Sequence, residues 1–192
     1  WKYAGWLTKK FTSVISPTQT ISRIIKNKTG AKPRTISYGV DLKIFRPHPG
    51  TEEKISTRVK FDLPLNVPVI LHTGRLDTDK SVKNVILATA SVLRESGAHL
   101  LVVGDGNQKQ SLEELCRSLG IESRVRFTGF ISNKKELAEI YRISDLFVTA
   151  SEIETQGIAI LEAAASGLPI VAVKATCIPE IVQHGNNGYL TN

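Results

Sequence analysis

The sequence predicts an α/β protein built on a doubly wound parallel sheet of about six strands. From residue 67 onward, apolar β-branched segments of four to six residues alternate with helical patterns of ten to fifteen, as in consecutive βαβ units. Residues 100–103 (LLVV) and 169–173 (PIVAV) are almost continuously apolar, as expected of strands covered on both faces. Right-handed crossovers between such strands place helices on both sides of one sheet.

The expected elements follow one another in a regular series. Strands are predicted at residues 67–73, 98–104, 125–129, 145–151, 169–174 and 187–191. Helices are predicted at residues 82–96, 108–120, 133–143 and 157–167, with a short helix at 179–185. Ligands of a doubly wound sheet bind at the carboxyl ends of its strands, so the loops that follow the strands are the candidate site.

The first sixty residues do not fit this series. They predict a basic, aromatic helix at 1–11, a single buried strand at 13–18 and a second basic helix at 19–28. Residues 33–50 then predict a strand that runs into a Gly/Pro-rich connector. One strand and two helices cannot close a core, so we interpret residues 1–48 as the end of another domain and residues 49–192 as the main domain. Trp1 in place of a start methionine, and no methionine elsewhere, lead us to expect a fragment of a longer protein.

Charge is unevenly distributed along the chain. The formal net charge is +7, but residues 1–60 alone carry +10 and the remaining residues carry −3. Such a basic block could meet the phosphates of nucleic acid or anionic lipid, or could be solvated surface. No apolar run approaches the roughly 20 residues that cross a bilayer. Two cysteines without a CxxC pattern predict reduced thiols in a cytoplasmic protein.

The first candidate loop reads TGRLDTDKS, residues 73–81. Gly74 allows a close backbone turn, while Arg75 and Lys80 place a forked guanidinium and a point-charge ammonium in one loop before a helix. This combination suits a diphosphate, and the N–H groups of the helix N-terminus would add to it. The alternative is a solvated basic loop.

Two further loops carry candidate residues. The turn GDG begins at Gly104, but no glycine follows at Lys109, so this is no complete dinucleotide-binding motif and an ordinary strand-to-helix turn is the simpler interpretation. In SEIETQGIAILEAAASG, Glu154 precedes a helix and Glu162 lies inside it, between Leu161 and Ala163. A carboxylate in so apolar a helix needs partners, either a nearby cation or the hydroxyl groups of a ligand.

The remaining polar residues are less informative. His72 lies within an apolar strand, where a core histidine with satisfied hydrogen bonds is the usual finding. No set of His, Cys or acidic residues has metal-ligand spacing, so we predict no metal site.

Five segments together resemble the retaining glycosyltransferases of family 4, which have two Rossmann-like domains facing each other across a cleft. In the order of the family's motifs they are ISYGVDLKIFRP, GRLDTDKS, VVGDG, ASEIETQGIAILEAAASGLPIVA and IPEIVQHGNNGYL. The resemblance makes residues 49–192 the nucleotide-sugar-binding, Rossmann-like C-terminal half of a GT-B fold. Residues 1–48 are then a remnant of the N-terminal, acceptor-binding domain and the inter-domain linker.

The resemblance also implies a role for each matching residue. Arg75 and Lys80 would hold the donor diphosphate and neutralise the leaving group, without a metal or other cofactor. Glu154 would hold the hydroxyls of the donor sugar, and Glu162 those of the ribose. The other donor-binding residues that it implies are Gly74, Gly104, Gly129, Phe130, Thr155, Gln156 and Gly157.

The expected function is transfer of a hexose, with retention, from a nucleotide-diphosphate sugar to a glycolipid or polysaccharide precursor. UDP-glucose is the favoured donor, because Thr155–Gln156–Gly157 resembles bacterial glucosyltransferases that act on diacylglycerol. The basic, aromatic N-terminal third suits peripheral contact with an anionic membrane at its cytoplasmic face. With most of the acceptor domain absent, we expect donor binding but little transfer by this chain alone.

Two other functions fit parts of the sequence. A non-catalytic nucleotide- or nucleic-acid-binding module would use the basic block and its aromatic residues, but leaves Glu154 and Glu162 unexplained, and we expect no nucleic-acid partner. A Rossmann-type dehydrogenase would need the third glycine that the turn at Gly104 lacks.

Overall fold

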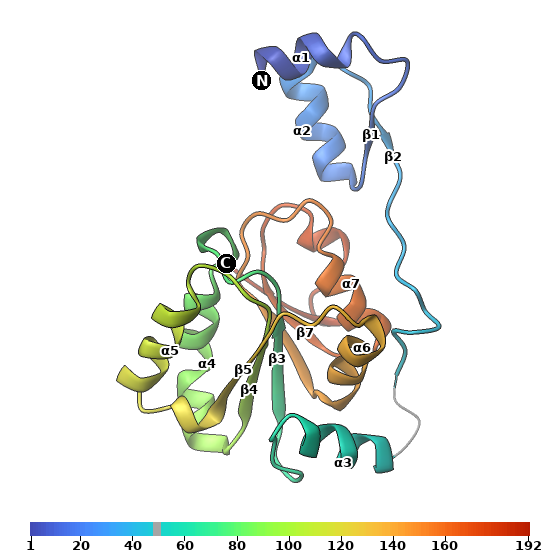
Figure 1. Ribbon diagram of the computed structural model, residues 1–192. Coiled ribbons are helices and arrows are strands. Elements are labelled where there is room, and N and C mark those ends of the chain that lie inside the picture. The colour runs from blue at the N-terminus through green and yellow to red at the C-terminus, as the bar shows by residue number, and fades with distance from the viewer. Residues whose placement is uncertain (48–50) are drawn as a thin grey trace.

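The computed structural model describes residues 1–47 and 51–192. It confirms the doubly wound parallel sheet, which has six strands in the order β5-β4-β3-β6-β7-β8, all parallel (Figure 1). The strands are β3 (Val69–Thr73), β4 (His99–Val103), β5 (Val125–Gly129), β6 (Leu146–Thr149), β7 (Ile170–Val173) and β8 (Gly188–Thr191). The strand order reverses between β3 and β6, which makes the edge above these two strands the expected binding crevice.

Helices cover both faces of this sheet. They are α3 (Thr51–Lys60), α4 (Val82–Ser96), α5 (Lys109–Ser118), α6 (Lys134–Ile143) and α7 (Ile158–Ala165). Figure 1 shows α4 and α5 on one side of the sheet and α3, α6 and α7 on the other. Strand side chains alternate between the two resulting cores: Leu71 and Phe147 lie in one, while Ile70 and Val148 lie in the other.

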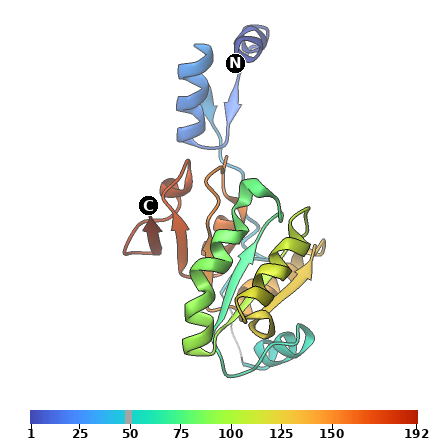
Figure 2. The same cartoon turned by 90° about the vertical axis from the view of Figure 1, so that its left-hand side faces the viewer.

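The N-terminal residues form a small separate unit. It consists of α1 (Lys2–Thr8), β1 (Ile15–Ser16), α2 (Gln19–Thr29) and β2 (Arg34–Thr35), with β1 and β2 paired in parallel. Figure 2 shows this unit standing apart from the main sheet. The predicted buried strand at 13–18 is wrong in extent and burial: β1 has two residues, and Ile15 is 60% exposed because no core covers it here.

The N-terminal unit touches the main domain through the start of α2. Glu180 accepts hydrogen bonds from the backbone N–H groups of Gln19 and Thr20, at 2.9 and 2.7 Å. Burial opposes ionisation of Glu180, but these hydrogen bonds outweigh it and lower the pKa of the carboxyl. The Thr18 hydroxyl donates to the carbonyl of Thr155 at 3.0 Å, which places α2 beside the loop that follows β6.

Two local predictions differ from the structure. Helix α3 has no counterpart among the predicted elements, because its 10 residues include few apolar ones and its buried anchor is Arg58, a residue type that signals exposure. The short helix predicted at 179–185 is only a 3-10 turn, Ile178–Glu180. The domain boundary at residues 48/49 lies outside the described residues. No helix in the described part of the chain is long and apolar enough to cross a membrane.

Candidate active site

Three loops at the carboxyl edge of the sheet are joined by backbone hydrogen bonds. Gly74 N–H donates to Val103 O at 3.0 Å, Leu76 N–H to Asp105 O at 2.9 Å, and Gly104 N–H to Gly129 O at 2.9 Å. A Cβ atom on Gly104 would lie 1.8 Å from the carbonyl oxygen of Gly74, and the φ of Gly104 is +141°. The glycine at 104 is therefore required by the packing of two protein loops, whether or not a ligand lies above them.

Two adjoining cavities lie above this edge. The larger, of about 760 Å³, is lined among others by Arg75, Gly104, Phe130 and Glu162. The smaller, of about 230 Å³, is lined by a set that includes His72, Lys80 and residues 154–160. Both cavities are also lined by Thr73, Gly74, Ile158 and Ala159. The two predicted acids thus lie in different compartments of one continuous site.

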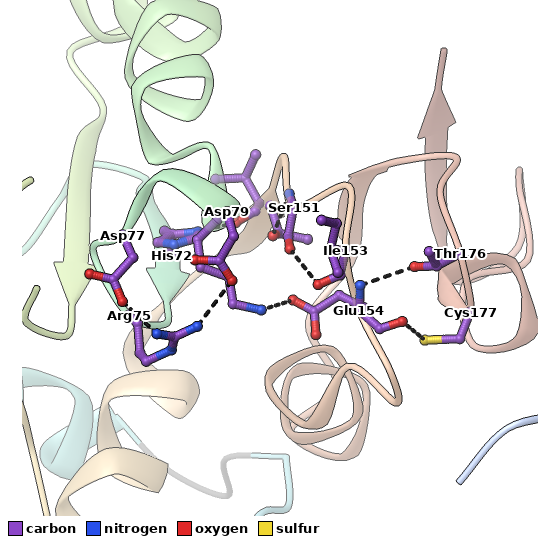
Figure 3. Close-up of polar contacts among 12 residues, drawn as sticks. His72, Arg75, Asp77, Asp79, Ser151, Ile153, Glu154, Thr176 and Cys177 are labelled. Atoms are coloured by element: carbon purple, nitrogen blue, oxygen red, sulfur yellow. Dashed lines mark hydrogen bonds and ion pairs between the residues drawn. The ribbon is translucent and has the colours of Figure 1, made fainter. Parts of the chain in front are cut away.

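Lys80 and Glu154 form an ion pair in the smaller cavity. The Lys80 Nζ atom lies 2.7 Å from Oε1 of Glu154, and each side chain is less than one-fifth exposed. Glu154 is held from the other side by its own backbone: its N–H donates to Oγ1 of Thr176, and its carbonyl accepts from Sγ of Cys177 (Figure 3). The carboxylate therefore has a fixed position before any ligand binds.

Arg75 is turned toward the acids of its own loop. Its guanidinium contacts Asp77 at 2.5 Å and Asp79 at 3.0 Å, and its side chain is 65% exposed (Figure 3). Arg75 lines the larger cavity and Lys80 the smaller, and Gly74 lines both. Each cation, however, is already paired with carboxylates of the same chain, which must be displaced or shared when an anion binds.

Glu162 belongs to a chain of hydrogen bonds that reaches the sheet. Its Oε2 atom lies 2.9 Å from the hydroxyl of Tyr141, which lies 2.6 Å from Oγ1 of Thr73. Because a phenol has one proton and a carboxylate only accepts, the Tyr141 hydroxyl donates to Glu162 and accepts a hydrogen bond from the Thr73 hydroxyl. The sequence predicted either a nearby cation or ligand hydroxyl groups as partners of Glu162. In the structure its hydrogen-bond partner within the protein is instead the neutral hydroxyl of Tyr141.

Burial is the main cause of the raised pKa values of Glu162 and Tyr141. It raises the pKa of Glu162, and the hydrogen bond from Tyr141 and the charge of Lys134 only partly oppose it. Burial also raises the pKa of Tyr141 well above its ordinary value, and the neighbouring charge of Glu162 adds to this. The Tyr141 ring is fixed by edge-to-face contact with Phe45 and stacking on Phe147, with centroids 5.7 and 6.0 Å apart.

The loop between Glu154 and α7 has two different faces. The Gln156 side chain is buried, and its amide nitrogen donates to Ser37 Oγ and Tyr38 O at 3.0 and 2.9 Å. Its side chain thus anchors the N-terminal linker, and the ligand contact that the resemblance implies for Gln156 falls to its backbone. Within the described residues, the N–H groups of Thr155, Gln156 and Gly157 donate no hydrogen bond and remain available beside the smaller cavity.

Gly129 ends β5, and Phe130, which follows it, lines the larger cavity. Gly129 has a φ of +76°, and Phe130, 76% exposed, lines that cavity with Glu162 and Gly104. The wall is apolar here, so a flat heterocycle could lie against it.

His72 is not the satisfied core histidine that the sequence indicated. It is buried as predicted, and its Nδ1 lies 2.9 Å from Val148 O. Its Nε2 atom, however, has no hydrogen-bond partner among the described residues.

Sequence reasoning missed four residues of this site: Thr73, Asp77, Asp79 and Tyr141. The signal for Tyr141 was a carboxylate in an apolar helix that needed a partner, but pairing α6 with α7 requires the fold. The signal for the aspartates was their spacing of two and four positions from Arg75, within reach of its side chain.

The fold and the position of the site define a class of protein, namely the Rossmann-like C-terminal half of a GT-B glycosyltransferase. The family model described as glycosyl transferases group 1 matches residues 53–192. Since this match covers most of the chain, the chain belongs to the group 1 glycosyltransferase family, which confirms the resemblance found in the motifs.

Individual relatives agree with this assignment. The chain is 32% identical over 176 residues to an uncharacterised glycosyltransferase of Methanocaldococcus jannaschii, covering 88% of this chain and 45% of that protein. It is 34% identical over 182 residues to the alpha-monoglucosyldiacylglycerol synthase of Streptococcus pneumoniae, covering 93% and 38%. The crystal structure of Anabaena HepE in complex with UDP-glucose matches with a TM-score of 0.85 at 28% identity, covering 99% and 52%. The chain therefore spans about half the length of these proteins or less.

Proposed function

We propose that this chain is the donor-binding part of a glycosyltransferase that moves a hexose from a nucleotide-diphosphate sugar to a glycolipid or polysaccharide precursor, with retention. Within it, residues 49–192 form the nucleotide-sugar-binding domain, and residues 1–48 belong to the acceptor domain and linker. The whole enzyme would bind its acceptor mainly through the part of the protein that lies outside this chain.

The observation that carries the proposal is the division of one site into two cavities with an acid in each. A nucleotide sugar has two sugar rings joined by a diphosphate, and the cavities share Gly74 at their junction. With the diphosphate over Gly74, the ribose lies near Glu162 and the transferred sugar near Glu154. The nucleobase then reaches the apolar wall that Phe130 forms.

The residues around the junction suit the charge that develops in the reaction. Breaking the bond between the sugar and the diphosphate leaves extra negative charge on the phosphate oxygens. Arg75 and Lys80, one in each cavity, would neutralise that charge, so we propose that the reaction needs no metal and no other cofactor. Glu154 and the N–H groups of residues 155–157 would hold the sugar's hydroxyls and orient its anomeric carbon.

We take UDP-glucose as the proposed donor, and two of the comparisons support it. Anabaena HepE, matched over nearly the whole of this chain, was solved with UDP-glucose, and the pneumococcal relative is a glucosyldiacylglycerol synthase. The second of these also supports a lipid acceptor. We further propose contact with an anionic membrane, because Trp1, which precedes α1, and Tyr3 and Trp6 within α1 are exposed beside basic residues. Sedimentation with anionic vesicles, lost at high salt and absent with neutral vesicles, would test it.

Family membership disfavours a nucleic-acid-binding module or a dehydrogenase. The direct experiment is calorimetric titration of the chain with UDP, GDP and ADP, using Arg75→Ala and the exposed Arg117→Ala as a matched control. We expect UDP to bind best and Arg75→Ala to weaken it by about tenfold or more, since a hydrogen bond between charged groups is lost. Equal, weak binding of all three nucleotides that both variants reduce alike would overturn the proposal.

A further inference from the structure

The hydrogen bond of His72 fixes the tautomer of its ring and leaves Nε2 without a partner among the described residues. The side chain lies in β3 and is 1% exposed. Its Nδ1 atom lies 2.9 Å from the carbonyl oxygen of Val148, which can only accept, so Nδ1 carries the ring proton. The neutral ring then presents the lone pair of Nε2 as a hydrogen-bond acceptor. Burial lowers the pKa of His72, with the Val148 contact opposing it, which favours the neutral ring at pH 7.

The unpaired nitrogen faces the candidate site. His72 lines the smaller cavity together with Gly74, Lys80 and Glu154. A Cβ atom on Gly74 would lie 3.5 Å from Nε2, and that nitrogen is the nearest atom it would meet. The glycine therefore places no side chain over Nε2, where the Cβ atom of any other residue would contact it.

Buried side-chain atoms without partners are rare, and each requires an explanation. The described residues contain two others, Nε of Arg58 and Oγ of Ser166, and neither residue lines either cavity at the carboxyl edge. The other two guanidinium nitrogens of Arg58 donate hydrogen bonds to four carbonyl groups and Asp145, and these bonds explain why the Arg58 side chain is buried. Among the residues that the structure describes, only His72 combines a buried unpaired atom with a position in the lining of the site.

The chemistry of Nε2 restricts what can pair with it. A lone pair needs an N–H or O–H group, so the ionised oxygens of a diphosphate are excluded as partners. Lys80 has such groups, but its ammonium lies 2.7 Å from Glu154 and has the diphosphate as its proposed partner. The hydroxyls of the transferred sugar are the groups of a nucleotide sugar that fit.

We propose that His72 is a specificity residue of the donor site, whose Nε2 accepts a hydrogen bond from a hydroxyl of the sugar bound in the smaller cavity. This inference rests on the proposed function. It predicts that His72 contributes to the binding of a nucleotide sugar and contributes nothing to the binding of the nucleotide alone.

Two substitutions separate this role from a structural one. His72→Asn keeps an amide that can donate to Val148 but has no acceptor at the position of Nε2. His72→Gln is longer and places a polar atom near that position. The affinities of the 192-residue chain and of both variants are measured by calorimetry for UDP and for UDP-glucose.

We expect His72→Asn to bind UDP like the unchanged chain and to bind UDP-glucose about three- to tenfold more weakly, the usual effect of one hydrogen bond. His72→Gln should recover part of the difference. Equal losses for both ligands, or no loss for either, would overturn the inference and leave the proposed function intact. Failure of the unchanged chain to bind UDP would overturn both.

A spectroscopic measurement gives an independent answer. The chain has four histidines, so ¹⁵N-histidine labelling gives few ring resonances, and His72→Asn identifies those of His72 by their loss. The resonance of an unprotonated ring nitrogen moves upfield when its lone pair accepts a hydrogen bond. We expect UDP-glucose to shift the Nε2 resonance in this direction and UDP to leave it in place. A shift of the same size with both ligands would contradict a contact to the sugar.

Discussion

Nζ of Lys80 lies 2.7 Å from Oε1 of Glu154, although the two residues are 74 positions apart in the chain. They come from the loops that follow β3 and β6, which are neighbours at the point where the strand order of the sheet reverses. The residues proposed to hold the diphosphate and the sugar therefore hold each other in the free protein. Under the proposed function, binding of the donor would exchange this pair for contacts with the ligand.

Replacing Glu154 with glutamine tests this exchange. The change removes a negative charge beside the proposed diphosphate and frees Lys80, so we expect affinity for inorganic pyrophosphate to rise. The partly buried Lys80 also loses its charged partner, so we expect a stability loss of about 1–3 kcal/mol, between the values for exposed and buried pairs. Calorimetry and thermal unfolding measure the two effects. Glu152→Gln, an exposed acid in the same loop, is the control and should change neither.

Asp79 is expected to weaken anion binding by holding Arg75. In Asp79→Asn the guanidinium keeps a weaker neutral partner, so affinity for both pyrophosphate and UDP should rise by about two- to fivefold, as the loss of a modest exposed ion pair predicts. Stability should change by less than about 0.5 kcal/mol, because the pair is exposed. Asp62→Asn, which breaks an exposed pair with Arg126, is the matched control. Unchanged or weaker pyrophosphate binding in Asp79→Asn would contradict this role.

Tyr141 is expected to position the Glu162 carboxylate. Tyr141→Phe keeps the ring between Phe45 and Phe147 but removes the hydroxyl, which should cost about 1 kcal/mol of stability. Affinity for UDP should fall about three- to tenfold, because Glu162 loses the donor that fixes it, while affinity for pyrophosphate, which has no ribose, should stay the same. Equal losses for both ligands in titrations would indicate a general disturbance of the site.

The raised pKa of Glu162 predicts a pH-dependent gain in stability for Glu162→Gln. Burial raises the folded-state pKa above the unfolded value, so the native carboxyl stabilises the fold below the unfolded pKa and loses that contribution as pH rises through the folded pKa. Glutamine does not titrate. We compare the unfolding temperature of the variant with that of the native chain at each pH. The variant's value minus the native value should be larger at pH 8 than at pH 4 and should decrease as pH falls. A difference that is constant with pH would contradict a raised pKa.

Much of the fold could be predicted from the sequence because the main domain obeys simple periodicities. The helix α4 and the strand β5 have the predicted bounds, since their apolar residues recur with helical and extended spacing. Helix α3 escaped this logic because its buried anchor is an arginine, whose terminal guanidinium nitrogens donate to carbonyl groups outside the helix, one of them at the distant Ile143. Such pairing is a property of the folded chain and leaves no local pattern.

The candidate site was predictable as a set of loops, and its internal contacts were not. Topology places the ends of parallel strands together, so Arg75, Lys80, Glu154 and Glu162 could be assigned to one edge. The contacts Lys80–Glu154 and Tyr141–Glu162 depend on side-chain directions that spacing does not encode. The glycine at 104 had two explanations in the sequence, and the 1.8 Å approach to the Gly74 carbonyl identifies loop packing as the one the fold requires.

The division of the site between the two acids is tested most directly by titrating Glu154→Gln and Glu162→Gln, beside the unchanged chain, with UDP and with UDP-glucose. We predict that Glu162→Gln lowers the affinity for both ligands, because both contain the ribose. Glu154→Gln should bind UDP at least as well as the unchanged chain but lose the additional affinity that glucose provides. The assignment of the two cavities would be wrong if Glu154→Gln lowered the affinity for UDP as much as that for UDP-glucose. It would also be wrong if Glu162→Gln left the affinity for UDP unchanged.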